Sequence, residues 1–502
     1  MKTFSKLAAL AALAASIAYA TPHLRDLPIV ESSQLRSALT RSELLAKAQI
    51  LEDFAYNTTE RNRAIFSPGH KATYEYIYKF IQDLGDYYDV EYNEFTAESS
   101  SGKASVDGVP IASASPMTYT ASGVVTGKVV QVANLGCDAA DYPAEVSGSV
   151  ALIIRGTCTF GAKAKLAGQA GAIGTIIYNN VPGAFGGTLG GDDPDFVPTV
   201  GITDVDGLAL VAAIGNGTKT ATLDVLVTQL PTYNVIAQTK GGDQENVLTI
   251  GAHSDSVPAG PGINDNGSGS VTLLEIAKQL TAFKTNNAVR FGWWSAEEVG
   301  LVGSTRYVEG LSPEELAKIK LYLNFDMLAS PNYVYAIYDG DGSAFNTSGP
   351  PGSDAAEHLF EEYFKNEANL PFVPTEFDSR SDYAAFAAAG IPVGGLFTGA
   401  EVQKTEEEAA LFGGQAGVSY DANYHLAGDN VANLDMDAWI ENSKAVAHAV
   451  ATYATSFESL GNENSIVGPE RAQWRQKLPA GEPVAAHRIG GCSHSHDNDV
   501  EI

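Results

Sequence analysis

The sequence predicts an α/β fold in which a mixed, mostly parallel sheet is sandwiched by helices. Residues 247–250, 289–294 and 320–325 are short apolar runs bounded by turns or helical patterns. Such runs are typical of buried parallel strands. Histidine or carboxylate residues follow each run within one to four positions, and open α/β sheets bind ligands outside the carboxyl ends of their strands. The apolar runs and the residues that follow them therefore predict both the sheet and a ligand-binding site at the carboxyl ends of its strands.

The chain begins with the features of a secretory signal peptide. Lys2 and Lys6 precede an Ala/Leu-rich stretch, and small residues for cleavage stand at 18–20, which is the expected layout of such a signal. We predict a signal peptide at 1–20 and a secreted, extracellular protein, with the vacuolar lumen as second choice. Residues 21–40 fit either a prosegment or an N-terminal arm. No later apolar run reaches about 18 residues, so we expect no membrane span.

Composition excludes several kinds of partner. The 502-residue chain carries a formal net charge of −29 and 44% hydrophobic residues, so it can bury large cores while its acidic surface repels nucleic acid and anionic membranes. We expect a soluble monomer. Glycosylation sequons stand at Asn57, Asn216, Asn266 and Asn346. We expect Asn266 to carry no glycan, because it adjoins a predicted metal ligand.

The main domain is predicted in two pieces, 41–120 and 228–455. In the first piece, residues 44–84 have helical periodicity and residues 89–95 are strand-like, as expected for early elements of the sheet and its cover. The apolar strand runs resume only after residue 228. An insertion is therefore expected between the two pieces.

The insertion is predicted to be an α+β domain at 121–227. Alternating apolar patterns at 124–132 and 150–154 precede an Ala/Lys-rich helical stretch and a strand-like run at 173–178. Cys137 and Cys158 lie within it. In an oxidising compartment their spacing suggests one disulfide in a small domain. The alternative is free thiols, as in a cytosolic chain, which conflicts with the signal peptide.

Five metal-type ligands follow in chain order, and a spare carboxylate, Glu297, stands beside the third. They are His253, Asp265, Glu298, Asp326 and His425. Each zinc takes about four N or O ligands, so two ions that share one bridging carboxylate need five protein ligands plus a water. The count predicts two Zn²⁺ per chain and a hydrolase. Glu297 is then free to act as general base.

Local sequence supports two of these assignments. Asp265 sits in a glycine-rich loop, where glycines let the backbone fold tightly, and an amphipathic segment follows at 271–280. Asp255 stands two residues beyond His253. We predict that the Asp255 carboxylate fixes the tautomer of the His253 imidazole and raises its basicity.

The residues around the ligands resemble a known family. Gly-Ala-His-Ser-Asp at 251–255, Trp-Trp-Ser-Ala-Glu-Glu at 293–298 and Leu-Asn-Phe-Asp at 323–326 are similar to motifs of the co-catalytic di-zinc aminopeptidases. That family includes vacuolar aminopeptidase Y and the fungal secreted group called leucine aminopeptidase 2. The resemblance runs from about residue 40 to residue 455 and implies a zinc-exopeptidase-like fold.

The resemblance also implies roles for the ligands. His253 and Asp326 would hold one zinc, and Glu298 and His425 would hold the other. Asp265 would bridge them. The implied substrates are peptides with a free N-terminus, with a preference for leucine and other apolar residues.

Further residues take roles from the same resemblance. Glu297 would be the general base, and Tyr424 would help to hold the oxyanion. Arg380 and Asp382 lie in a stretch that resembles the family's pocket wall, so we predict them as substrate-side or supporting residues. Many relatives carry a cysteine pair around the last histidine. This chain has Asn423 and Gly428 near His425 instead, which predicts a loop without a disulfide.

The inserted segment resembles a second family. Arg-Gly-Thr-Cys-Thr-Phe-Gly-Ala-Lys-Ala at 155–164 is similar to the protease-associated domain. The resemblance implies a lid or docking surface beside the cleft. A structural insertion without a ligand is an equal alternative.

Two other patterns predict no functional site. Asp339-Gly-Asp341-Gly begins like a calcium loop, but the twelfth position is Pro350 where a glutamate should stand. We interpret it as a turn. Residues 456–502 are polar and include Pro, Gly and the odd Cys492, which predicts a flexible C-terminal tail.

Two alternative functions remain open at this stage. A carboxypeptidase or dipeptidase of the same metal architecture would keep every ligand and add basic groups for a terminal carboxylate. A non-catalytic, receptor-like ectodomain would keep the fold and the insertion but typically lose ligands. All five ligands and Glu297 are present here, which favours an enzyme.

Overall fold

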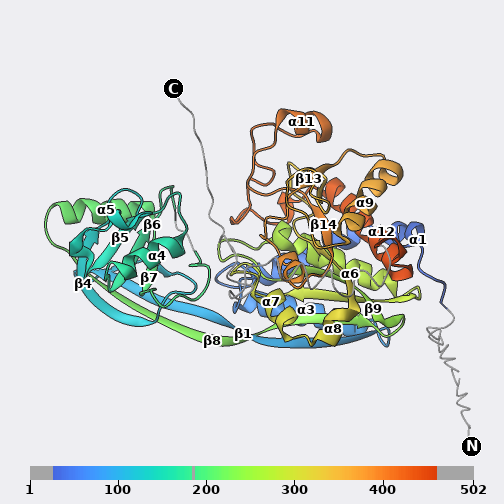
Figure 1. Cartoon of the computed structure of the whole chain (residues 1–502), viewed down its shortest axis with the longest axis horizontal. Coiled ribbons are helices and arrows are strands. Elements are labelled where there is room, and N and C mark those ends of the chain that lie inside the picture. The colour runs from blue at the N-terminus through green and yellow to red at the C-terminus, as the bar shows by residue number, and fades with distance from the viewer. Residues whose placement is uncertain (1–26, 184–186, 461–502) are drawn as a thin grey trace, which may run out of the picture.

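The computed structural model describes residues 27–183 and 187–460. The predicted signal peptide at 1–20 and Cys492 lie outside these residues. Figure 1 shows a large main body and a smaller inserted body, joined by a long two-stranded ribbon. The ribbon consists of β1 (Tyr88–Val106) and β8 (Thr220–Thr239). The two strands pair antiparallel over the whole length of β1.

The main body is built around a mixed sheet in the order β13-β12-β14-β11-β9-β10-β8. Its further strands are β9 (Asp243–His253), β10 (Asn287–Trp294), β11 (Ile319–Phe325), β12 (Ala336–Tyr338), β13 (Val373–Thr375) and β14 (Val393–Phe397). The pairs β9–β10, β9–β11, β11–β14 and β12–β13 are parallel, whereas β8–β10 and β12–β14 are antiparallel. The three predicted apolar runs are β9, β10 and β11, so the mostly parallel α/β sheet is confirmed.

Helices cover both faces of this sheet. They are α1 (Ser32–Ala38), α2 (Arg41–Tyr56), α3 (Pro68–Asp83), α6 (Gly269–Leu280), α7 (Val302–Gly310), α8 (Pro313–Lys318), α9 (Ser353–Glu362), α10 (Tyr383–Ala388) and α12 (Met436–Thr455). Helix α11 (Glu406–Phe412) has no buried residue and lies away from the sheet (Figure 1). Trp293 packs into a cluster with α2, α3, α6 and α12, whereas Trp294 packs with α7 and α10. Successive side chains of a strand point to opposite faces, so β10 contributes one tryptophan to each layer.

Capping residues explain where several helices begin. The Thr40 hydroxyl accepts the Glu43 N–H at the start of α2, and the Asp435 carboxylate accepts two N–H groups at the start of α12. Such caps satisfy N–H groups that have no partner within the helix. No helix within 27–183 and 187–460 is long and apolar enough to cross a membrane.

The inserted body has the predicted α+β composition. Its elements are β2 (Val109–Ile111), β3 (Ser115–Pro116), β4 (Gly123–Gln131), η2 (Ala139–Asp141), η3 (Ala144–Val146), β5 (Val150–Ile154), α4 (Phe160–Gln169), β6 (Gly174–Tyr178), β7 (Thr199–Ile202) and α5 (Asp204–Gly215). Strands β4 to β7 are parallel neighbours in chain order. Cys137 and Cys158 form the predicted disulfide.

The structure shifts the predicted start of the insertion. Ala104 and Met117 fall within the predicted main-domain piece at 41–120, but each packs into a core cluster of the inserted body. The strand pattern of β1 runs without a break from one body into the other, so no turn marks the boundary in the sequence. The far half of the ribbon belongs to the inserted body.

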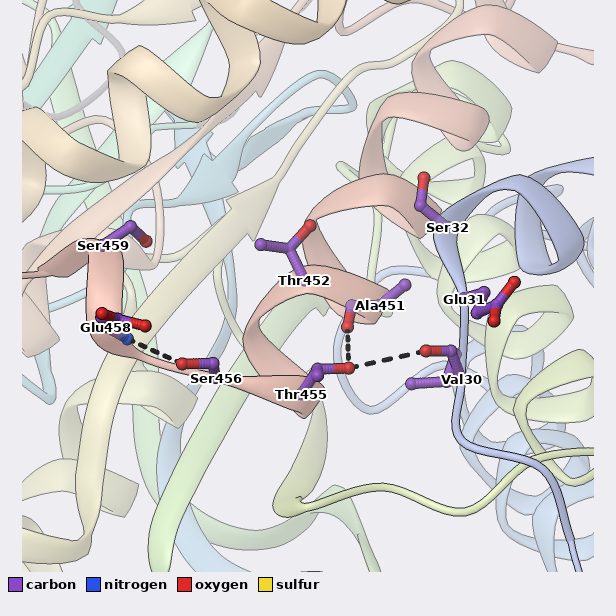
Figure 2. A pocket seen from close by; sticks show the side chains of 9 residues that line it. All are labelled: Val30, Glu31, Ser32, Ala451, Thr452, Thr455, Ser456, Glu458 and Ser459. Atoms are coloured by element: carbon purple, nitrogen blue, oxygen red, sulfur yellow. Dashed lines mark hydrogen bonds between the residues drawn. The ribbon is translucent and has the colours of Figure 1, made fainter.

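Both described ends of the chain pack on the main body. Leu35 of α1 is fully buried against a core that includes α12. Figure 2 shows a pocket between residues 30–32 and the end of α12, and none of the predicted site residues lines it. Glu458–Leu460 form η7, and Leu460 is buried. The first residues of the predicted tail at 456–502 are therefore part of the ordered body.

Candidate metal centre

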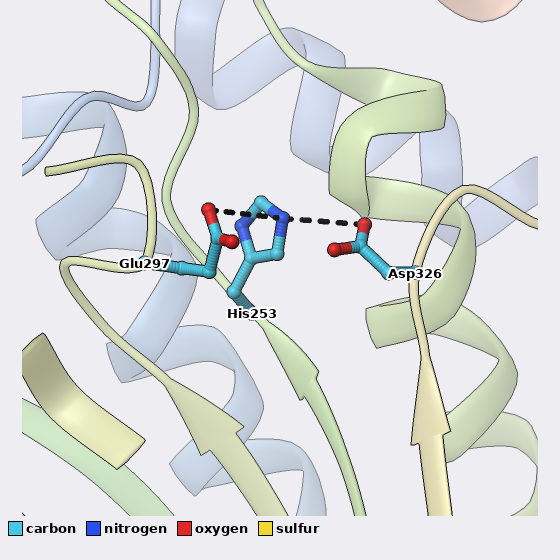
Figure 3. Close-up of side chains that lie close together, drawn as sticks. All are labelled: His253, Glu297 and Asp326. Carbon is cyan, nitrogen blue, oxygen red and sulfur yellow. Dashed lines mark ion pairs between the residues drawn. The ribbon is translucent and has the colours of Figure 1, made fainter. Parts of the chain in front are cut away.

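Three parallel strands end together at the site. His253 is the last residue of β9, Glu297 follows the end of β10 by three residues, and Asp326 directly follows β11. The register pairs His253 with Trp294, the last residue of β10. Figure 3 shows the three side chains together, with His253 between Glu297 and Asp326. The edge of the sheet predicted from the sequence therefore carries the cluster.

His253 is the centre of the first group of ligands. Its Nε2 lies 3.1 Å from Oδ1 of Asp265 and 3.3 Å from Oδ1 of Asp326. Oε2 of Glu297 is more distant, at 3.8 Å from the same nitrogen. Asp265 reaches this point from η4 (Ile263–Ser268), which connects β9 to α6.

His425 is the centre of a second group. Its Nε2 lies 3.1 Å from Oδ2 of Asp265 and 3.1 Å from Oε2 of Glu298. His425 comes from the long loop between α11 and η6 (Val431–Asn433). The two oxygens of Asp265 therefore face two different histidines.

Buried carboxylate oxygens indicate where cations fit. In the described part of the chain, Oε1 of Glu298 and Oδ1 of Asp326 are buried and have no hydrogen-bond partner. Burying such an oxygen is costly, and a divalent ion bound by imidazole nitrogen and carboxylate oxygen removes the cost. His253, Glu297 and Asp326 have ligand atoms within 4.8 Å of one another, as do His253, Asp265 and Glu298. The donor set fits zinc.

Burial and charge shift the protonation of the cluster. Burial raises the pKa of Glu297 well above its usual range and also raises the pKa of Glu298. Burial opposes a charged His253, but the charge of Asp326 raises the pKa of that imidazole. Divalent cations would favour ionised carboxylates and neutral imidazoles. The cluster is thus an acid-rich site suited to positive charge.

A chain of buried hydrogen bonds orients Asp326. Ser381 Oγ donates to Oδ2 of Asp326 at 2.6 Å, and Asn324 Nδ2 donates to Ser381 Oγ at 2.8 Å. The Tyr322 hydroxyl donates to Asn324 Oδ1 at 2.9 Å and accepts from the Trp294 indole at 2.8 Å. Because Oδ2 is occupied, Oδ1 is the atom left for a cation.

Asp255 lies between His253 and the Glu297-Glu298 pair. Its carboxylate is 3.8 Å from His253 Nδ1, whereas its backbone carbonyl oxygen is 3.2 Å from that nitrogen. The carboxylate accepts the backbone N–H of Glu297 at 3.2 Å and of Glu298 at 3.4 Å. Burial raises its pKa to about 7. Asp255 thus contacts His253 through its carbonyl oxygen and, at longer range, its carboxylate, so its predicted role beside the imidazole stays a prediction.

Arg63 supports the centre and was not predicted. Its side chain is fully buried. Its guanidinium donates to the carbonyl oxygens of Ser254, Pro261 and Gly262. Burial lowers its pKa only to about 10, so it stays charged. Arg63 therefore fixes the backbone around the ligand loops and brings a cation close to the carboxylates.

His70 is a second buried support that was not predicted. Its Nε2 lies 3.1 Å from the hydroxyl oxygens of Ser254 and Ser295. Those hydroxyls donate to the carbonyl oxygens of Trp294 and Tyr233, so a proton on Nε2 of the imidazole lets them accept from it. Burial lowers the pKa of His70 to about 3, which keeps it neutral.

Tyr424 and Arg380 lie at the outer side of the cluster. The Tyr424 ring stacks on His425 with centroids 3.8 Å apart. Its hydroxyl accepts from Nη2 of Arg380 at 3.2 Å, and Arg380 also pairs with Glu401 at 3.0 Å. Asp382 is fully buried, and burial raises its pKa to about 7. Of the two predicted pocket-wall residues, only Arg380 is exposed.

The loop that carries His425 is held by polar contacts. Asn423 and Gly428 pack against each other so closely that a Cβ on Gly428 would lie 2.0 Å from Oδ1 of Asn423. Nδ2 of Asn423 donates to Oδ1 of Asn433 at 2.7 Å. The loop has no cysteine pair at these positions, and polar contacts hold its two ends together.

Asn266 cannot serve as a glycosylation site in the folded chain. Its side chain is fully buried, donates to the Phe325 carbonyl oxygen at 2.9 Å and accepts the Gly269 N–H at 2.9 Å. The Asp265–Asn266 peptide bond is cis. The other three sequon asparagines are exposed.

The Asp339–Asp341 segment forms a turn, as predicted. Asp339 accepts backbone N–H groups of residues 343–345, and Glu357 accepts those of Gly340 and Asp341. These contacts account for the third acidic group within ligand range, which consists of Asp339, Asp341 and Glu357.

Fold and site together define a class of protein: a metal-dependent hydrolase whose His and carboxylate ligands lie at the ends of parallel strands. The chain belongs to peptidase family M28, whose family profile matches residues 234–450. A PA domain profile matches residues 125–210.

Relatives and solved structures agree with this family. The chain is 51% identical over 460 residues to the "Probable leucine aminopeptidase 2" of Aspergillus fumigatus, which covers 90% of this chain and 91% of that one. It is 48% identical over 472 residues to leucine aminopeptidase 2 of Arthroderma otae, 93% of each chain. BSAP, a zinc aminopeptidase from Bacillus subtilis, matches with a TM-score of 0.68 and 26% identity over 86% of this chain and 97% of that one. The predicted family and enzyme class are confirmed: the chain is a zinc metallo-aminopeptidase.

Proposed function

We propose that this aminopeptidase works with two Zn²⁺ ions bridged by Asp265, and the position of that carboxylate carries the proposal. Oδ1 and Oδ2 each lie 3.1 Å from a different imidazole, that of His253 and that of His425. Asp326 would complete the first site, and Glu298 would complete the second. Each ion would have three protein ligands, which leaves room for water and substrate.

Glu297 is the proposed general base. Zinc, when bound, supplies Lewis-acid chemistry and acidifies water. Glu297 is not needed as a ligand, and its carboxylate would take a proton from the attacking water and return it to the leaving amine. The Asp255 carboxylate would hold the backbone so that Glu297 and Glu298 take these separate tasks. The Tyr424 hydroxyl, next to Arg380, would donate to the oxyanion.

The proposed substrates are peptides with a free N-terminus, with a preference for leucine and other apolar residues. The names of the fungal relatives support the leucine preference. A carboxypeptidase or dipeptidase would need a cation for a terminal carboxylate. Arg380, the cation predicted near the site, is already engaged by Glu401 at 3.0 and 3.2 Å. This pairing favours the aminopeptidase.

We also propose a secreted, glycosylated monomer. The exposed sequons at Asn57, Asn216 and Asn346 support glycosylation, and the Cys137–Cys158 disulfide supports an oxidising compartment. The receptor-like alternative gains no support, because all five proposed ligands and Glu297 lie close together.

Release of 4-nitroaniline from leucyl 4-nitroanilide by the purified protein tests the function. We expect activity that is lost with a chelator, with Glu297→Gln and with an N-acetylated substrate. Activity on the acetylated substrate would indicate another peptidase class. Activity that survives metal removal would contradict the zinc mechanism.

A further inference from the structure

We propose that Asp429 is a positioning residue that ties the His425 loop to the bridging Asp265 and so sets the spacing of the two metal positions. The inference rests on the proposed two-zinc function. Asp429 follows His425 by four residues and is 2% exposed. It is not one of the proposed metal ligands, and its carboxylate accepts backbone N–H groups of the Asp265 loop.

Three successive backbone N–H groups of the Asp265 loop donate hydrogen bonds to Asp429. Its Oδ1 accepts the Asn264 N–H at 2.7 Å, and its Oδ2 accepts the Asp265 N–H at 3.0 Å. Its own carbonyl oxygen accepts the Ile263 N–H at 3.1 Å. The bridging ligand is therefore held, through its own backbone, by the loop that carries the last histidine.

A second carboxylate, that of Asp421, binds the Asp265 loop and precedes His425 in the sequence. Oδ2 of Asp421 accepts Nδ2 of Asn264 at 2.7 Å, and Asp421 also accepts Nδ2 of Asn433 at 2.9 Å. Both ends of the segment 421–429 thus contact Asn264 or Asp265. The packing of Gly428 against Asn423 leaves no space for another side chain just before Asp429.

The chemistry of the contact requires a carboxylate. Two N–H donors face two separate oxygens of Asp429, and both oxygens of a carboxyl group can accept. An asparagine at 429 could accept one backbone N–H with its Oδ1. Its N–H₂ group would then face the second backbone N–H, and two donors cannot bond each other. Asp429→Asn keeps the size of the side chain and breaks one of the two hydrogen bonds to the Asp265 loop. The variant therefore tests these hydrogen bonds rather than the packing.

Loss of the link should act unequally on the two metal positions. Two ligands of the first position, His253 and Asp326, are held by β9, β11 and Ser381, and this position shares only Asp265 with the second. The position of His425 and Glu298 depends on the loop. Partners of this kind typically affect metal affinity or activity by about 10–100-fold. We expect a change of that size for one ion and little change for the other.

The test uses the full-length zinc enzyme with Asp429→Asn. Asp435→Asn is the matched control, because Asp435 also accepts two backbone N–H groups, at the start of α12. Zinc content is measured after dialysis against graded chelator, and the Co²⁺-substituted forms are compared by electron paramagnetic resonance, which detects magnetic coupling between ions that share a bridge.

We expect Asp429→Asn to lose one ion at about 10–100-fold lower chelator concentration and to lose coupling, while Asp435→Asn matches the wild type. Wild-type metal retention and coupling in Asp429→Asn would overturn the proposal. If the wild type itself binds one ion, the two-zinc function fails instead. Should Asp429→Asn not fold, Gly428→Ala, which pushes Asn423 against the same turn, must show the same selective loss for the proposal to stand.

Discussion

Glu297 and Glu298 are adjacent carboxylates with separate environments. Glu298 contacts His425 at 3.1 Å, whereas Glu297 lies 3.8 Å from His253. Ala296, just before the pair, has a φ of 64°, a left-handed conformation that is uncommon for alanine and concentrates at functional sites. The turn sends the two side chains to different parts of the cluster, as their proposed roles require.

The proposed role of Glu297 predicts a specific defect. Glu297→Gln keeps the shape of the side chain but cannot accept a proton, so we expect kcat to fall by about 10²–10⁴-fold with zinc content unchanged. Steady-state kinetics and metal analysis on the same sample measure both quantities. Loss of zinc in the variant would instead make Glu297 a ligand.

His70 predicts a pH dependence of stability. Burial lowers its folded pKa to about 3, whereas a histidine in the unfolded chain titrates near 6.5. The unfolded state therefore binds the extra proton, and stability that is present above pH 6.5 is lost as the pH falls toward 3. His70→Gln keeps an N–H donor and does not titrate.

We expect the Tm of His70→Gln to fall less steeply than that of the wild type between pH 6.5 and 4. Thermal unfolding at several pH values measures the slopes. Parallel slopes for the two proteins would show that His70 is protonated in the folded state or that other groups dominate.

Among single residues, the proposed ligands are easier to recognise in the sequence than the residues that support them. His253 and Asp326 follow recognisable strands, so residue type and position together indicate metal binding. Arg63 and Asp429 lie in irregular segments, and each acts through backbone groups distant in sequence. No spacing or periodicity marks such contacts, and only the folded backbone brings them together.

At the scale of elements, a buried ion pair joins α2 to α6, the helix that follows the Asp265 loop. Nζ of Lys47 lies 2.6 Å from Oε2 of Glu275, and the two side chains are 6% and 0% exposed. Removing one partner of such a pair leaves a buried charge and costs about 3–5 kcal/mol.

We therefore expect Lys47→Met to lower the free energy of unfolding by about 3–5 kcal/mol, and Lys47→Met with Glu275→Gln to recover much of the loss. Denaturant unfolding of the single and double variants measures the coupling. A double variant no more stable than Lys47→Met would mean that packing, rather than charge, dominates at this site.

The strands were predicted where they are apolar and short. Runs within β9, β10 and β11 could be recognised because both faces of these strands are buried, which gives continuous apolar sequence. The ribbon β1–β8 has mixed burial along its length, so its 19 and 20 residues and their passage between two bodies were not evident. The predicted domain boundary failed at that element for this reason.

At the scale of the whole molecule, the ribbon connects two bodies with separate cores. Ala97 pairs with Leu230 on the ribbon, next to the main body, where Ala97 packs against Ala296. Residues 98–229 could be replaced by an Asn-Gly turn, which suits a two-residue hairpin. We expect the shortened protein to fold and to hydrolyse leucyl 4-nitroanilide.

Hydrolysis rates of leucyl 4-nitroanilide and of longer peptides by the shortened protein then distinguish the two hypotheses for the inserted body, a docking surface or a structural insertion. Loss of rate on long peptides alone would indicate a docking surface, and equal rates on both would indicate a structural insertion. Failure to fold would show that the main body depends on the inserted one.

The proposed mechanism depends on a pair of zinc ions on either side of the Asp265 carboxylate. Anomalous diffraction at the zinc edge from crystals of the zinc-loaded enzyme locates such ions. We expect two peaks, one contacting His253 and Asp326 and the other contacting Glu298 and His425, with an oxygen of Asp265 on each. A single peak in fully loaded crystals, or a second peak away from Asp265, would contradict the proposed mechanism.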